Sequence, residues 1–276
     1  MRTDFENIGG FCQMPLFPKI ARADLHFWEE PCISGTNGSG TIFFSGCALK
    51  CVYCQNYEIS HKNQGKIITP KELSELFVQL EKKGAHNINF VNPSHYLWAI
   101  KEALKIYKPK IPLVYNSSGY DLQENILEDI FDVYLFDLKY IDEQRANKYS
   151  FAPNYFEIAS KALLAAKSVV GKPKFDTQGI MQRGIIVRHL VMPLATNEAI
   201  RVIDWFADNL SDYYLSIMAQ YTPCGNLEKF PEINRKITNR EYDKVLNHLY
   251  EKELQNVFLQ EKDSASESYI PEFNFH

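Results

Sequence analysis

The fold of this chain is decided by the stretch Ser45-Gly46-Cys47-Ala48-Leu49-Lys50-Cys51-Val52-Tyr53-Cys54. Three of the six cysteines stand here at C-x3-C-x2-C spacing, directly after the apolar residues 41–44. A loop this short can wrap three thiolates around one face of an iron–sulfur cube and leave the fourth iron without a protein ligand. The spacing therefore predicts an iron–sulfur site with one iron open to chemistry.

Three other roles for cysteines fit this stretch less well. A closed zinc site needs four ligands, usually in two paired hooks, and only Cys51 and Cys54 form such a pair. His61 or Cys32 would have to complete the tetrahedron, so zinc stays open as the alternative metal. A disulfide framework is not expected in a chain of 276 residues without a secretory leader. Buried inert thiols are common singly, but three on one polar, glycine-flanked loop are not explained that way.

The composition is that of a globular protein with a sizeable core. A chain of 276 residues, with 45% hydrophobic and 23% charged residues, fits one large domain. A net charge of −4 gives no electrostatic footprint for nucleic acid or an anionic membrane. No run of about 18 apolar residues occurs, and residues 1–7 do not resemble a signal peptide. We expect a soluble cytoplasmic protein whose thiols stay reduced.

Strand-like and helix-like segments alternate from residue 41 onward. Thr69-Pro70-Lys71-Glu72 combines a capping box with proline at the first helical position, which predicts a helix start, and Gly84 marks its end. Apolar runs predict strands over 41–45, 87–91, 113–116, 133–138, 184–191 and 214–221. Further helices are predicted up to residue 107 and over 123–131, 142–149, 154–170, 197–210 and 239–253, with a polar loop over 171–182. This alternation indicates a parallel sheet wrapped by helices.

The two ends of the chain carry fewer periodic signals. Residues 1–40 are expected to form an extension packed on the core, with the carboxylates of Glu29 and Glu30 in solvent. His26 is expected to lie at the surface or to have its hydrogen bonds satisfied within the protein. The domain itself is expected over 41–256. Residues 257–276 are expected to form a C-terminal tail docked on that core.

Polar side chains gather at the carboxyl ends of the predicted strands, where sites lie in parallel α/β folds. They are Asn92, Ser117, Ser118, Asp137, Lys139, Arg188 and Tyr221. Simpler roles exist beside the functional ones: Asn92 could start a helix, the two serines could form a plain turn, and Asp137 could pair with Lys139. Arg188 lies in an apolar strand and needs an anion, whereas His189 faces the other way and is expected to pack.

The cysteine stretch resembles the cluster loop of the radical S-adenosylmethionine (SAM) superfamily, whose pattern is C-x3-C-x-aromatic-C. Tyr53 supplies the aromatic residue. The resemblance implies a partial (β/α)6 barrel in which Cys47, Cys51 and Cys54 hold a [4Fe-4S] cluster and the open iron chelates SAM. It also implies cofactor contacts from Tyr53 near the adenine, from Asn92, Ser117, Ser118 and Tyr221, and from Asp137, Lys139 and Arg188 near the carboxylate. One electron from the cluster would then cleave SAM to a 5′-deoxyadenosyl radical.

Further stretches resemble the homologue family of pyruvate formate-lyase activating enzyme. They are His26-Phe27-Trp28-Glu29-Glu30-Pro31, Gly38-Ser39-Gly40-Thr41, Tyr115-Asn116-Ser117-Ser118-Gly119-Tyr120, Asp137-Leu138-Lys139-Tyr140 and Arg188-His189-Leu190-Val191. This resemblance implies hydrogen abstraction from a glycine on a partner protein, a glycyl radical enzyme, with flavodoxin or ferredoxin as the electron donor. Cys12, Cys32 and Cys224 are expected to be ordinary thiols.

Two other functions stay open at this point. The same radical chemistry could act on a small molecule, a peptide or RNA, because the sequence shows no substrate motif. A non-catalytic zinc or iron–sulfur binding protein is the alternative from another class.

Overall fold

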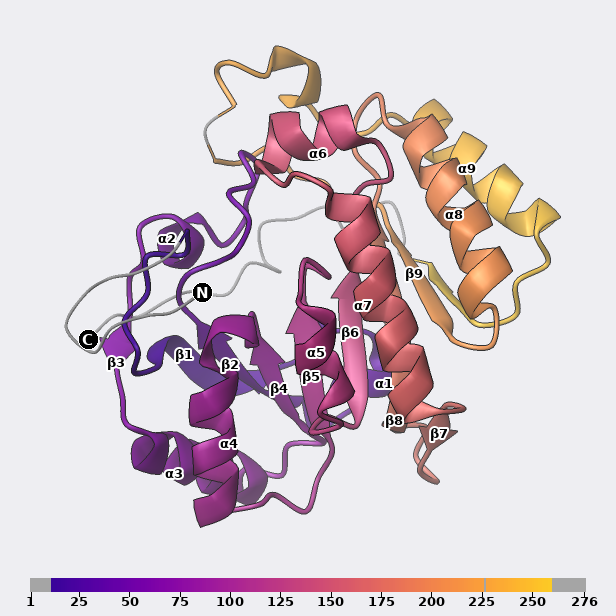
Figure 1. Cartoon of the computed structure of the whole chain (residues 1–276). Coiled ribbons are helices and arrows are strands. Elements are labelled where there is room, and N and C mark those ends of the chain that lie inside the picture. Colours follow the sequence, from indigo (N-terminus) through magenta and orange to yellow (C-terminus); the bar gives the residue numbers. More distant parts are fainter. Residues whose placement is uncertain (1–10, 226, 260–276) are drawn as a thin grey trace.

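A mostly parallel sheet, curved and open, runs through the computed structural model, which describes residues 11–225 and 227–259 (Figure 1). Within these residues the strand order is β10-β9-β8-β6-β5-β4-β2-β1-β3, with β7 paired to β8. The strands are β1 (Lys19–His26), β2 (Ser39–Phe44), β3 (Lys66–Ile67), β4 (Ile88–Val91), β5 (Leu113–Ser117), β6 (Val133–Asp137), β7 (Lys174–Phe175), β8 (Met181–Leu190), β9 (Tyr214–Met218) and β10 (Val257–Leu259). Neighbours from β2 to β10 pair in parallel, and β1 joins β2 antiparallel. Because the sheet does not close on itself, the predicted partial α/β barrel is confirmed.

Helices connect the strands, and those from residue 70 onward cover one face of the sheet, which we call the outer face (Figure 1). In chain order the helices are α1 (Pro31–Ser34), α2 (Tyr57–Ser60), α3 (Pro70–Lys82), α4 (Leu97–Ile106), α5 (Gln123–Leu127), α6 (Glu143–Ser150), α7 (Tyr155–Val170), α8 (Thr196–Leu210) and α9 (Asn239–Glu251), with 3-10 turns at Ser94–Tyr96 and Pro231–Ile233. The predicted capping box at the start of α3 is present, with Thr69 and Glu72 bonding reciprocally. None of the helices within the described residues is long and apolar enough to cross a membrane.

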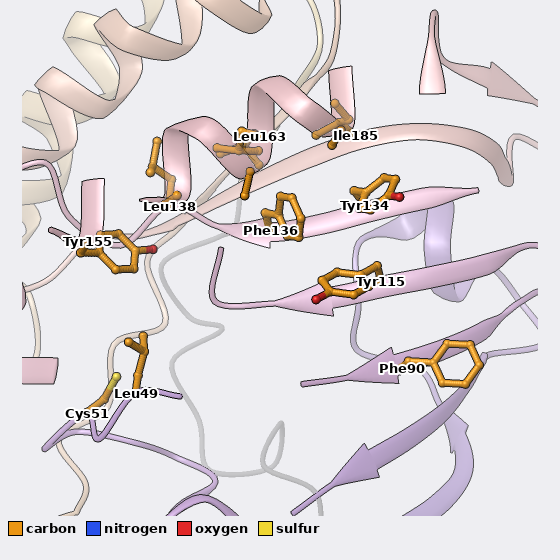
Figure 2. Close-up of a cluster of buried hydrophobic side chains, with 14 of the residues drawn as sticks. Leu49, Cys51, Phe90, Tyr115, Tyr134, Phe136, Leu138, Tyr155, Leu163 and Ile185 are labelled. Atoms are coloured by element: carbon orange, nitrogen blue, oxygen red, sulfur yellow. The ribbon is translucent and has the colours of Figure 1, made fainter. Parts of the chain in front are cut away.

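The core lies between the outer face and these helices. Alternate residues of each strand point to this side, so the large side chains stack in rows across neighbouring strands. Figure 2 shows Phe90, Tyr115, Tyr134 and Phe136 in such an arrangement, and ring centroids of Tyr115 and Phe136 lie 5.7 Å apart. The rings meet edge to face, as quadrupoles prefer. The same core reaches the cysteine loop through Cys51, labelled in Figure 2.

Three short elements differ from the sequence-based expectation. The expected loop over 171–182 contains β7, which pairs antiparallel with the start of β8. Val257–Leu259, within the residues expected to form the tail, adds a parallel strand beside β9. β1 lies within the expected extension; its alternation Arg22-Ala23-Asp24-Leu25 is the period-2 signal of a half-buried strand. The rest of the tail, residues 260–276, lies outside the described part of the chain.

Residues 26–34, which we call the inner strap, cross the opposite, inner face of the sheet. Cys32 and Ile33 pack there in a second apolar cluster with Val114, Val133, Leu135, Met181 and Ile186. The Asn87 amide in front of β4 donates a hydrogen bond to the Ile33 carbonyl at 2.7 Å. In Figure 1, α1 accordingly lies behind β6 and β8, on the side away from α5 and α7. The strap therefore fills the half-barrel near the amino ends of its strands. Near their carboxyl ends it leaves room for a pocket.

Candidate active site

A pocket of about 250 Å³ lies at the carboxyl ends of the parallel strands, between the cysteine loop and the inner strap. All of the site residues predicted from the sequence line this one pocket. They are Cys47, Cys51, Tyr53, Cys54, Asn92, Ser117, Ser118, Asp137, Lys139, Arg188 and Tyr221. The parallel topology explains the convergence, because every strand that carries one of them ends at the same edge.

The backbone of the cysteine loop is fixed to its neighbours on both sides. Gly46 N–H donates to the Ile59 carbonyl at 2.9 Å, and Val52 N–H donates to the Tyr149 carbonyl in α6 at 2.9 Å. Gly46 has φ 83°, and a Cβ there would lie 2.3 Å from Met14 Cγ. Glycine is therefore required where the chain turns out of β2 into the loop.

Each of the three loop thiols has a hydrogen-bond partner. Leu49 N–H donates to Cys47 Sγ at 3.4 Å, and the Ser150 hydroxyl donates to Cys51 Sγ at 2.9 Å. Cys54 Sγ lies 3.2 Å from the Ser60 hydroxyl oxygen. Donors of this kind stabilise thiolates and raise the reduction potential of clusters that thiolates bind. These hydrogen bonds thus suit the thiolate form of the three cysteines, in which they act as ligands of a cluster.

Burial acts against the charged form of these thiols. It raises the pKa of Cys47 to about 12 and that of Cys51 to about 11; for Cys51 the charge of Lys139 opposes this rise. Burial likewise raises the pKa of Cys54. Such thiols ionise when a metal coordinates them, since a metal deprotonates its thiol ligands outright. The donor set therefore fits a metal-bound state in which all three sulfurs are thiolates.

The alternative zinc site finds no support in the arrangement of side chains. Within residues 11–225 and 227–259, no three His, Cys, Asp or Glu side chains are grouped so that they could hold one ion. Cys32 lies in the inner apolar cluster, and His61 Nδ1 is 2.9 Å from the Ser60 hydroxyl. Cys32 thus lies apart from the cysteine loop, whereas His61 stays beside it, because Ser60 also contacts Cys54 Sγ at 3.2 Å.

Aromatic side chains form the wall beside the cysteine loop. The hydroxyls of Tyr53 and Tyr140 share a hydrogen bond of 2.7 Å, and Tyr140 contacts the Ser150 hydroxyl at 2.8 Å. The Tyr53 ring packs on Tyr221 with centroids 5.8 Å apart, and the Tyr221 hydroxyl donates to the Ile233 carbonyl. Both hydroxyls are therefore engaged within the protein, and the two rings, 7% and 1% exposed, form a packed part of the pocket wall.

A buried charge network forms another wall. The Arg188 guanidinium donates to Glu29 Oε2, to Asp137 Oδ1 and to Asn116 Oδ1, each at 2.8 Å. The ion pair expected from the spacing of Asp137 and Lys139 is present at 2.7 Å. Burial alone would raise the pKa of Asp137, but the charges of Arg188 and Lys139 hold that pKa below its usual range. Asp137 is therefore a carboxylate held by two cations.

Asn92 and the two serines occupy the turns after β4 and β5. Asn92 has φ 57°, and Cys47 Sγ lies 4.0 Å from its Oδ1. The Ser117 hydroxyl donates to Asp121 Oδ2 and accepts from Gly119 N–H at 3.0 Å, so it shapes the turn. The Ser118 carbonyl accepts from the Tyr155 hydroxyl at 2.7 Å. These hydrogen bonds join residues of the protein to one another. The contacts of the three residues with SAM remain predictions.

The sequence reasoning missed the residues that the inner strap brings to the pocket. His26, Trp28 and Glu29 all line it. The expectation that the carboxylates of Glu29 and Glu30 lie in solvent is wrong: Glu29 accepts from Asn89 and Asn116 at 3.0 Å as well as from Arg188, and the whole of Glu30 is 7% exposed. Burial raises the pKa of Glu30, the charge of Arg188 opposes this, and the neighbouring Glu29 adds to it. The one signal in the sequence for a distant acidic partner was Arg188, an arginine in an apolar strand that contains no acidic residue.

His189 is placed as expected, on the other side of β8 from Arg188. The residue is 1% exposed, and its Nδ1 lies 2.7 Å from the Leu138 carbonyl oxygen. Cys12 and Cys32 are buried and form no disulfide within the described residues, and the Cys224 thiol donates to the Tyr53 carbonyl at 3.2 Å.

Comparison with known proteins matches part of the chain to a family. Residues 41–175 match the model of the Radical SAM superfamily. A curated relative, Uncharacterized protein MJ0674 of Methanocaldococcus jannaschii, is 32% identical over 234 residues, which cover 80% of this chain and 64% of the relative. The chain thus spans less than two thirds of that relative's length.

Solved structures share the fold at low sequence identity. SuiB of Streptococcus suis matches with a TM-score of 0.51 and 12% identity, over 81% of this chain and 48% of SuiB. TYW1 with a lysine-pyruvate adduct bound matches with a TM-score of 0.55 and 12% identity, over 82% of this chain and 78% of TYW1. HydG, a maturase of the [FeFe]-hydrogenase, matches with a TM-score of 0.52 and 14% identity, over 79% of this chain and 50% of HydG.

The family match begins at the strand before the cysteine loop and includes all three loop cysteines. The superfamily implies a [4Fe-4S] cluster and S-adenosylmethionine as cofactors, and the three thiols, with donors at Cys47 and Cys51 and a hydroxyl contact at Cys54, fit that cluster. Sequence pattern, open parallel half-barrel and pocket agree with this match, and residues 41–175 carry the domain of the radical SAM superfamily.

Proposed function

We propose that this protein is a radical SAM enzyme that abstracts a hydrogen atom from a glycine of a partner protein, as a glycyl radical enzyme activase does. The observation that carries the radical chemistry is the convergence of Cys47, Cys51 and Cys54 with Asp137 and Lys139 on one pocket. When bound, a [4Fe-4S] cluster supplies one electron to SAM, whose S–C5′ bond breaks to give methionine and a 5′-deoxyadenosyl radical.

The residues of the chain have separate tasks in this proposal. The three cysteines hold the cluster as thiolates, and the loop bonds to Ile59 and Tyr149 keep them in place. The structure gives the Lys139 ammonium one acceptor, Asp137, so it has hydrogens left for a cofactor carboxylate. The packed rings of Tyr53 and Tyr221 make this part of the wall apolar and exclude water from the place proposed for an adenine ring.

Hydrogen abstraction from a protein glycine is the finer part of the proposal. Its support is the resemblance of the segments around Glu29, Ser117, Asp137 and Arg188 to homologues of pyruvate formate-lyase activating enzyme. We infer a cytoplasmic location, where thiols stay reduced, and flavodoxin or ferredoxin as the source of the electron.

Anaerobic reconstitution with iron and sulfide, followed by reduction with SAM, tests the radical chemistry. We expect about four irons per chain and the release of 5′-deoxyadenosine, detected by mass spectrometry. Cys51→Ala should fold but lose this release, whereas Cys32→Ala, which removes a thiol outside the pocket, should retain it. Undiminished cleavage of SAM by the Cys51→Ala protein would contradict the assignment of the cluster ligands.

A further inference from the structure

We propose that the inner strap is the substrate-binding wall of this pocket and that it receives an uncharged segment of polypeptide. The inference rests on the proposed radical function and names the class of its substrate. His26, Trp28 and Glu29 line the pocket but lie outside residues 41–175, the part that matches the superfamily. The strap therefore adds a surface to the pocket from outside the matched superfamily domain.

The strap is fixed firmly enough to serve as a wall. Glu29 has both carboxylate oxygens engaged, with Asn89 from β4, Asn116 from β5 and Arg188 from β8 as donors. Behind it, Ile33 is fully buried against the inner face of the sheet. A surface that is held before the ligand arrives loses little conformational entropy on binding.

The charges that line the pocket are already matched within the protein. Arg188 uses Nε, Nη1 and Nη2 on Asp137, Glu29 and Asn116, and Lys139 pairs with Asp137. Among the described residues that line the pocket, these are the two cations, and Lys139 lies next to Cys51 on the cofactor side. The two cations are paired with the carboxylates of Glu29 and Asp137, so this lining has no excess positive charge for a substrate phosphate or carboxylate, and anionic substrates are disfavoured.

The rest of the lining has no charged side chain outside the strap and network, and part of it can hydrogen-bond. Gln55, Gln220 and Thr222 line the pocket, and Thr222 Oγ1 is buried without a hydrogen-bond partner among the described residues. The acceptor within reach of the Gln220 amide is Met218 Sδ at 3.9 Å, a weak contact. Burial, with Arg22 and Arg188 nearby, lowers the pKa of His26 to about 4, so its imidazole is neutral at pH 7. Side-chain amides and hydroxyls both donate and accept, as a peptide backbone requires of its partners.

Exposed aromatic surface continues from the strap side of the pocket. Trp28 is 56% exposed and Phe27 is 49% exposed, although both belong to a segment with a buried core. Phe27 does not line the pocket and lies over Gly38, where an added Cβ would be 3.0 Å from its ring. A ligand that covers both rings must extend beyond the pocket, which favours a chain over a compact heterocycle.

Tryptophan fluorescence gives a direct test, because the chain has three tryptophans and two of them pack outside the pocket. Trp98 donates from Nε1 to the Leu16 carbonyl, and Trp205 packs against Phe156. In the Trp98→Phe/Trp205→Phe protein, emission reports on Trp28 alone. The probes are a pool of end-blocked, tryptophan-free heptapeptides with a central glycine and no charged residue, the same pool with aspartate on both sides of the glycine, and total tRNA.

We expect the uncharged pool to change Trp28 emission saturably, and the acidic pool and tRNA to leave it unchanged. In equilibrium dialysis, Trp28→Ala should bind the uncharged pool about tenfold or more weakly than wild type. Phe151→Ala, which removes an equally exposed aromatic side chain outside the pocket, should bind like wild type. No response to the uncharged pool, equal binding by the Trp28→Ala protein, or an equal or stronger response to the acidic pool or tRNA would each overturn the proposal.

The same proteins separate this proposal from the proposed function. Release of 5′-deoxyadenosine by the Trp98→Phe/Trp205→Phe protein, measured without peptide, reports on the radical chemistry alone. Peptide binding is measured without reductant and does not depend on that chemistry. Cleavage without peptide binding therefore refutes the strap as a substrate wall, and peptide binding without cleavage refutes the radical function.

Discussion

At the scale of single residues, the site depends on Glu29. Its carboxylate is 8% exposed and forms an ion pair with Arg188, which is 15% exposed. Removing one partner of a buried pair leaves the other charge without full compensation, which costs far more than losing a surface pair. Glu29 thereby ties the stability of the fold to the integrity of the pocket.

Replacing Glu29 measures how much its ion pair contributes to the free energy of unfolding. Glu29→Ala should lower the free energy of unfolding by about 3 kcal/mol. Asp24→Ala removes a solvent-exposed pair with Lys83 and should cost less than about 1 kcal/mol. Urea denaturation of the two variants makes the comparison, and equal losses would show that the Glu29 pair is no stronger than a surface contact.

His95 predicts a dependence of stability on pH. Burial lowers its pKa from 6.5 to about 4, and the ring is held by the Ser45 carbonyl at 2.8 Å. Between these two values the unfolded chain binds more protons than the folded one, so stability is complete above about pH 6.5 and falls as the pH drops toward 4. At pH 5 the loss from this one group is about 2 kcal/mol relative to pH 7.

Urea denaturation at pH 7 and pH 5 tests this expectation. His95→Gln should reduce the difference between the two pH values by that amount, whatever its effect at pH 7. An identical difference in wild type and variant would assign the pH dependence to other groups, such as His26.

The pocket residues differ in how far the sequence predicts them. Cys47, Cys51 and Cys54 follow from spacing alone, and Asp137 and Lys139 follow from their place at a strand end. Glu29 does not, because its partner Arg188 is 159 residues away and no local pattern links the two. Contacts of that kind depend on how the chain crosses the sheet.

At the scale of elements, two helices begin with the same kind of capping box. They differ in the further contacts that the capping glutamate makes. Thr69 and Glu72 cap α3, and Thr238 and Glu241 cap α9. Glu241 also accepts from Leu194 N–H at 2.8 Å and pairs with Arg235 at 2.8 Å, and these contacts hold its pKa well below its usual range. The start of α9 is thus a junction between three segments, whereas the start of α3 is a local cap.

The matched substitutions Glu72→Ala and Glu241→Ala should separate these two roles. Both lose the bond to the N-cap backbone, but Glu241→Ala also loses charge-assisted bonds, so we expect it to lose about 1 kcal/mol more. Thermal unfolding of the two proteins measures the difference. Equal melting temperatures would show that the contacts of Glu241 beyond the cap add nothing.

The elements predicted well are those with strong local signals. The capping sequence before α3 and the apolar stripe of that helix define its start and its buried face. β10 was missed because its three residues only become a strand by pairing with β9. α1 has four residues, too few for a helical period, and its position depends on the inner face that it covers.

At the scale of the whole molecule, the inner strap makes the N-terminal segment part of the core. Ile33 is fully buried against the sheet, whereas Ile67, in β3 at the sheet edge, is 53% exposed. A segment that is packed in this way should unfold together with the sheet instead of detaching first.

Two isoleucine truncations test that cooperativity. Ile33→Ala should lower the free energy of unfolding by about 2–4 kcal/mol, with an unchanged dependence on urea concentration, and Ile67→Ala should change little. A smaller urea dependence in the Ile33→Ala protein, or early hydrogen exchange of the strap in wild type, would show that the strap opens independently.

The path of the inner strap also has a consequence for the order of events during synthesis. Glu29 leaves the ribosome long before Arg188, which follows 159 residues later. Until β5, β6 and β8 have been made, the apolar residues of the strap have no surface to cover. Domains generally fold as units, and contacts between residues distant in sequence form slowly. The inner strap is therefore among the first described segments to be translated and among the last to reach its packed position.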